Sequence, residues 1–155
     1  MLKAIETLQK TRTALFKLTE GLSIEQLNKV PAGFNNNIVW NIAHIVAAQQ
    51  GVCYLRAGLK TVVDEQFYLA YKPDTKPGEF IDAEQLEEFK QLAFSTLDQL
   101  IADFDNNLFA NYVPWTTRYG VDINSIEEAI NFLPFHDGLH MGYIMALKRA
   151  VNAGL

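Results

Sequence analysis

The chain has three histidines, and two of them, His136 and His140, stand four residues apart. On an α-helix this spacing places both imidazoles on one face, with their Cβ atoms roughly 5–6 Å apart. Two rings at that separation can bind one divalent metal ion, because imidazole is a common ligand of zinc and related metals. The spacing therefore points first to metal chemistry.

The residues around this pair indicate that it faces the protein interior. At about 100° per residue, the face that carries both histidines also carries Ala129, Leu133 and Leu147. A buried imidazole is costly unless its nitrogens have polar partners, and a metal ion is one such partner. The alternative is two ordinary core histidines that are satisfied by hydrogen bonds.

The third histidine, His44, lies in a separate helical pattern, where Ala47, Ala48 and Gly51 leave space beside its ring. Three neutral imidazoles around one metal would leave a position open for water or substrate, as in catalytic zinc sites. A metal held in this way lowers the pKa of water or of a thiol toward neutrality. Zinc, nickel and iron all accept imidazole, so the ligand set alone does not select the metal.

Two residues near the histidine pair are tentative catalytic candidates. Tyr143 follows His140 by about one turn and could act as an acid or orient water, or could be a core tyrosine. Asp137 gives the run His-Asp-x-x-His, which resembles the His-Glu-x-x-His of metalloproteases with a shorter acid. Since Asp137 lies about 100° from His136, a solvated carboxylate or one that supports a ligand is the alternative.

Two further residues bear on binding. Arg118 lies in an aromatic connection and could bind an anionic group of a substrate or cofactor, or could be a solvated loop arginine. Cys53 follows His44 by nine residues and lies about 180° away around the helix, so we expect a small buried side chain and not a ligand.

Four segments show apolar residues at helical spacing: 2–20, 37–59, 82–104 and 125–150. Side chains that can cap helix starts stand at Ser23, at Asn36 or Asn37, at Asp82 and at Ser125. Pro134 should kink the last helix. The connection 60–82 is long enough to be a crossover or a lid, and the aromatic connection 108–123 could cover a pocket. No segment is a convincing strand, so the sequence predicts an all-α four-helix bundle in one domain, 1–155.

The second helical pattern is apolar on both of its faces, with Val39, Ile42, Val46 and Cys53 opposite His44. Such a helix is either central or part of an interface between subunits. Because a bundle of four helices has no central member, the pattern predicts a homodimer that forms through this helix.

The composition excludes several classes of partner. The net charge is −5, and no cluster of lysines and arginines interleaves with aromatic residues, which argues against nucleic-acid binding. No apolar run approaches the roughly 18 residues of a membrane span. A single cysteine suits a reducing compartment, and the first residues lack the apolar core of a signal peptide. A cytoplasmic protein that acts on a small molecule is the expectation.

Two runs carry a resemblance to a known family: Trp40 to Ile45 (WNIAHI) and His136 to Gly142 (HDGLHMG). With four helices and a long connection after the second, this pattern resembles the DinB-like family, also described as YfiT-like metal-dependent hydrolases. The resemblance implies a dimeric four-helix bundle with one long crossover. It also implies one divalent metal per chain, held by His44, His136 and His140.

Some members of that family transfer low-molecular-weight thiols or isomerise substrates with their help. The resemblance therefore implies an enzyme that activates a thiol or water, with a thiol S-transferase active in detoxification or stress response as the leading version. The alternative is a non-catalytic metal-binding module for stress response or interaction. Many members have glutamine where this chain has Tyr143, and some thiol-dependent members have a carboxylate where it has His136.

Overall fold

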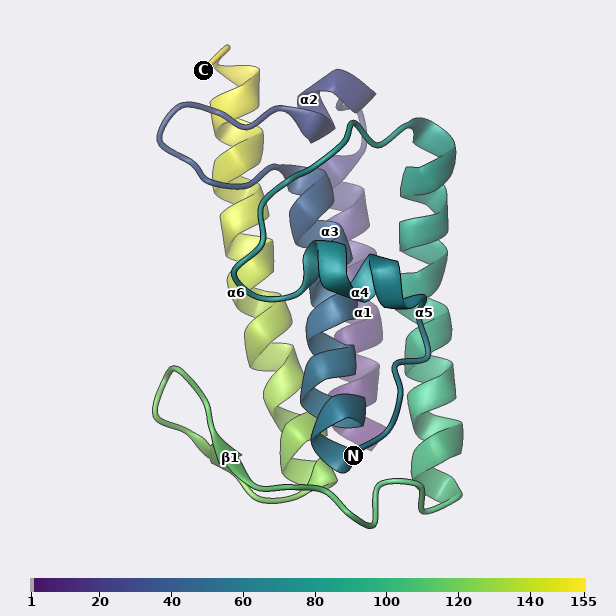
Figure 1. Cartoon of the computed structure of the whole chain (residues 1–155). Helices are drawn as coiled ribbons and strands as arrows, with labels where there is room; N and C mark the ends of the chain where they lie inside the picture. Colours follow the sequence, from purple (N-terminus) through teal and green to yellow (C-terminus); the bar gives the residue numbers. More distant parts are fainter. Residues whose placement is uncertain (1) are drawn as a thin grey trace.

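The structure, a computed structural model, describes residues 2–155 and contains four long helices. They are α1 (Leu2–Thr19), α3 (Ile38–Gln49), α5 (Ala83–Asp105) and α6 (Ile126–Asn152). Contacts between neighbouring helices give the order α1, α5, α3, α6 around the bundle (Figure 1). The all-α four-helix bundle that the sequence predicts is confirmed.

The connection between α3 and α5 is the long crossover. Figure 1 shows that α3 and α5 run in the same direction, opposite to α1 and α6, so the chain between them must return along the bundle. This return contains a short helix, α4 (Glu65–Tyr71), that lies against α3. The sequence did not predict α4, because seven residues are too few to show a clear helical period, although Phe67, Tyr68 and Tyr71 pack against the core.

The side chains predicted to cap the helix starts all do so, at Ser23, Asn37, Asp82 and Ser125. The first of them begins the short helix α2 (Ile24–Asn28). At Ser125 the hydroxyl accepts from the backbone N–H of Glu128. The carboxylate of Glu128 in turn accepts from the backbone N–H of Asn124 at 2.7 Å. The helix that follows continues across Pro134.

A small hairpin interrupts the connection between α5 and α6. Its strands, β1 (Trp115–Thr116) and β2 (Asp122–Ile123), pair antiparallel. The expectation of no strand is wrong here, because strands of two residues are too short to show alternation in the sequence. The turn between them includes Gly120, whose φ of +75° suits glycine.

Helix α3 is buried along its whole length within a single chain. Helices α2, α4, α5 and α6 all contact it, so the two apolar faces predicted from the sequence are covered without a second subunit. The inference of a dimer contact from those two faces therefore loses its basis, since the chain itself covers both faces and α4 was not predicted. The homodimer itself stays a prediction.

Helix α3 does not end at Gln49 but continues in a different form. A π-helical turn, Gln50–Tyr54, and a 3-10 turn, Leu55–Ala57, extend it to Gly58, which ends the segment at φ +72°. The end predicted near Leu59 is therefore close, but the change of helix type is new. Among residues 2–155, no helix has an apolar stretch long enough to cross a bilayer.

Candidate metal centre

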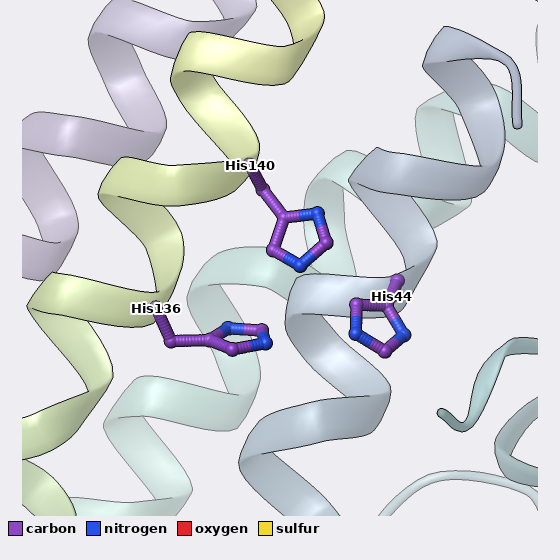
Figure 2. A group of neighbouring side chains, drawn as sticks. All are labelled: His44, His136 and His140. Atoms are coloured by element: carbon purple, nitrogen blue, oxygen red, sulfur yellow. The ribbon is translucent and has the colours of Figure 1, made fainter. Parts of the chain in front are cut away.

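The three histidines meet between α3 and α6. His44 comes from α3 and the other two from α6, and one ligand atom from each lies within 4.8 Å of the others. The ring centroid of His44 lies 5.4 Å from that of His136 and 4.7 Å from that of His140. Figure 2 shows the three rings turned toward one space, with a nitrogen of each facing it. The predicted convergence of the three imidazoles is present.

Hydrogen bonds orient two of the three rings. Nδ1 of His44 donates to the carbonyl oxygen of Tyr71 at 2.7 Å, and Nδ1 of His140 donates to Oδ1 of Asn41 at 2.8 Å. The amide of Asn41 is itself oriented, because its Nδ2 donates to the carbonyl of Asn37. With Nδ1 protonated, the lone pair of each imidazole is on Nε2, as metal ligation requires.

Burial keeps these two imidazoles neutral. The loss of water lowers the pKa of His44 to about 4 and that of His140 to about 3. The neighbouring imidazoles act in the same direction, since each disfavours a second positive charge. Both rings are therefore in the unprotonated form at neutral pH, and the donor set fits a divalent metal.

A buried ion pair stands behind the third histidine. Asp137 is fully buried, and its Oδ2 accepts from Nε of Arg12 at 2.9 Å. Its Oδ1 lies 3.7 Å from Nδ1 of His136, and neither atom has a hydrogen-bond partner within residues 2–155. Burial alone would raise the pKa of Asp137, but the charge of Arg12 and the nearby imidazole hold it below its usual value.

The prediction that Asp137 could be solvated is wrong, because α1 covers it and supplies Arg12. This arginine is also fully buried, and its Nη1 donates to Oε1 of Gln49 and to the carbonyl of Ala93. The sequence analysis missed it. A signal was present, since Arg12 follows Leu8 by four residues and so lies on the apolar stripe of its helix.

A cavity of about 990 Å³ opens beside the histidines. Both tryptophans of the chain line it, and Trp40 stacks on His44 with ring centroids 4.5 Å apart. The indole N–H of Trp40 donates to Oγ1 of Thr75, which belongs to the crossover. The crossover and the aromatic connection that could cover a pocket thus both contribute to the cavity wall.

The other residues that the sequence analysis discussed differ in whether they reach the cavity. Arg118 lines the cavity. Tyr143 does not, because its ring packs edge-on against Phe34 at 5.5 Å and is about one-third exposed. Asp137 does not line the cavity either; it pairs with Arg12 and lies beside His136. Cys53 is buried as predicted, and burial raises its pKa to about 12.

Arg56 also lines the cavity and was not among the predicted site residues. In a regular α-helix Arg56, twelve residues after His44, would point about 120° away from it. The π turn takes one additional residue, which turns later positions back toward the face of His44, and Arg56 lines the same cavity as His44. Gly51 was one signal of irregularity: a Cβ there would lie 3.3 Å from the hydroxyl of Tyr68.

The fold is a helical bundle with one crossover, and its second and fourth long helices carry three inward histidines that could hold a metal ion. The chain belongs to the DinB superfamily, whose family model matches residues 7–144. No curated protein matches the chain. The resemblance inferred from the two histidine runs is confirmed at the level of the family.

Proposed function

We propose that this chain is a metal-dependent enzyme that activates a low-molecular-weight thiol or water for transfer to a small electrophile. His44, His136 and His140 would hold one zinc, nickel or iron ion. The observation that carries the proposal is the convergence of three imidazoles, two of them kept neutral by burial, at the wall of a large cavity. A site with that shape has room for a substrate next to the ligands.

The residues around the cavity have separate tasks in this proposal. Asn41 and the carbonyl of Tyr71 hold the tautomers of two ligands, and Trp40 shields His44 from water by stacking on it. A bound divalent metal supplies Lewis acidity, which lowers the pKa of a thiol or water that reaches it. Arg118 attracts an anionic group of the substrate or thiol at the cavity wall.

The alternative function, a non-catalytic metal-binding module, requires a closed ligand shell. Within residues 2–155 the group of possible ligands has three members, and no fourth side chain completes it. Structural zinc sites are usually closed by four protein ligands, whereas catalytic sites keep one position open. The open site therefore favours the enzyme.

The first experiment measures the metal content of tag-free wild-type protein and of the His44→Ala variant. We expect about one metal per chain in the wild type and a large loss in the variant. Cys53→Ala is the matched control, because it removes the other strong zinc ligand type without touching the cavity, and its metal content should not change. Protein that neither contains metal nor takes up added zinc would contradict the proposal.

The second experiment tests the reaction class with the metal-loaded protein. A panel of low-molecular-weight thiols is offered with chlorodinitrobenzene, and formation of the thioether is followed by absorbance. We expect acceleration by at least one thiol, and loss of that acceleration in His140→Ala and after chelation. Equal rates before and after chelation would exclude a metal-dependent transfer of that thiol.

A further inference from the structure

The cavity wall has a charge opposite to that of the whole chain. Its lining includes three cationic side chains, Arg56, Lys76 and Arg118, and one carboxylate, Asp74. The chain as a whole has a net charge of −5. A cleft lined by one sign of charge concentrates ligands of the other sign, because its walls focus the field. An anionic ligand is therefore favoured in the cavity of an acidic protein.

Arg56 is held in place by contacts that lead back to the helix. Its guanidinium lies 4.5 Å from the ring centroid of Trp115. The indole N–H of Trp115 donates to the hydroxyl of Tyr112, which donates in turn to the carbonyl of Val52 in the π turn. The hairpin and the π turn are thus tied together, and together they fix the arginine at the cavity wall.

The donors of Arg56 and Arg118 are available to a ligand. Within residues 2–155, the side chain of Arg56 has no hydrogen-bond or ion-pair partner, and cation–π stacking leaves the edge of a guanidinium free. The one ion pair of Arg118 is with Asp74 at 3.9 Å, and both side chains are mostly exposed. Such a pair is weak in water and gives way readily to a better anion.

We propose that Arg56 and Arg118 form an anion subsite, so that the substrate or thiol of this cavity carries a carboxylate or phosphate group. The two arginines come from different walls, one from the extension of α3 and the other from the turn of the hairpin. A guanidinium binds either anion through paired N–H donors. Which group at the other end of the ligand reacts rests on the proposed function, but anion binding at the subsite does not require a metal.

The test uses metal-free protein and three probes of similar shape: phenylacetate, phenyl phosphate and the neutral phenylacetamide. Binding is followed in proton–nitrogen correlation spectra, where the two indole signals come from Trp40 and Trp115, both in the cavity wall. We expect saturable shifts with at least one anion, and at least tenfold weaker binding of the amide. A preference for either anion supports the subsite and identifies its group.

Variants assign the effect to the two arginines. Arg56→Gln and Arg118→Gln should each weaken anion binding by about tenfold, the effect of losing one charge-assisted contact. Arg56→Lys keeps the charge without the planar fork and should be intermediate. Arg149→Gln is the matched control, because Arg149 is exposed on α6 and is not part of the cavity lining.

Three results would overturn the subsite. They are equal binding of the amide and the anions, an equal loss in Arg149→Gln, and no saturable shift with either anion up to millimolar concentration. Zinc uptake by the same samples separates the two proposals. Zinc binding without anion binding would overturn the subsite alone, whereas anion binding without zinc uptake would overturn the proposed enzyme alone.

Discussion

The ion pair between Arg12 and Asp137 allows the sharpest test of the packing described above, through the variant Asp137→Asn. Both side chains have an exposed fraction of 0%, and Nε of Arg12 lies 2.9 Å from Oδ2 of Asp137. Asparagine has the same shape and can still accept from the arginine. The substitution therefore removes a charge and little volume, and leaves the guanidinium buried without a counterion.

The size of the expected loss of stability follows from this geometry. Breaking a fully buried pair by removing one charge costs about 3–5 kcal/mol, because the remaining charge is uncompensated in a poorly polarisable interior. Arg12 keeps its contacts with Gln49 and with the carbonyl of Ala93, which favours the lower end of that range. We expect a loss of about 3 kcal/mol, or about 10 °C in Tm for a chain of this length.

The assay is urea unfolding of metal-free protein. We expect the slope of the free energy of unfolding with urea concentration to be unchanged. Asp103→Asn is the matched control: Asp103 is also buried, but accepts from the neutral groups Tyr54 Oη and Gln99 Nε2. It should cost no more than about 1 kcal/mol. A loss below about 1 kcal/mol in Asp137→Asn, or equal losses in the two variants, would refute the assignment of a strong buried pair.

Four further outcomes are expected. Asn41→Leu should weaken zinc binding about ten- to a hundredfold in a chelator competition, because His140 loses the acceptor of its Nδ1 proton, whereas Tyr71→Phe keeps its backbone carbonyl and should have no effect. The thiol of Cys53, whose pKa burial raises to about 12, should react with a chromogenic disulfide only after unfolding. The thiol of Cys53 ionises near pH 9 in the unfolded chain but stays protonated in the folded one. The contribution of Cys53 to the free energy of unfolding should therefore be present below pH 9 and lost as pH rises toward 12. Asp82→Ala removes the N-cap of α5 and should cost about 1 kcal/mol in the same urea assay.

The long helices could be predicted because their signals are local. Apolar residues recur every three or four positions, and a capping side chain precedes each of the last three long helices, as Asp82 precedes α5. The short helix α4 and the hairpin could not be predicted in this way. Each has too few residues to show a period, and each is held mainly by contacts with distant parts of the chain.

The ligand residues could also be predicted, since His136 and His140 stand one turn apart on an apolar face. Their supporting partners could not be assigned to them, because each partner is distant in the sequence and its contact depends on how the helices pack. Asn41 is 99 residues from His140, and Arg12 is 125 residues from Asp137. Arg56 was missed for a different reason: a π turn changes the face of every later residue, and a calculation at a constant angle per residue cannot include it.

The cluster of histidines would be a poor choice for a core that serves packing alone. Burial lowers the pKa of His44 and of His140, so the folded chain forgoes the hydration that both imidazoles have when unfolded. Nδ1 of His136 is buried without a hydrogen bond, which is a further cost. Apolar side chains of similar volume would avoid both costs. An arrangement that carries these costs, yet is oriented by Asn41 and the backbone of Tyr71, is not explained by packing alone and fits a binding site.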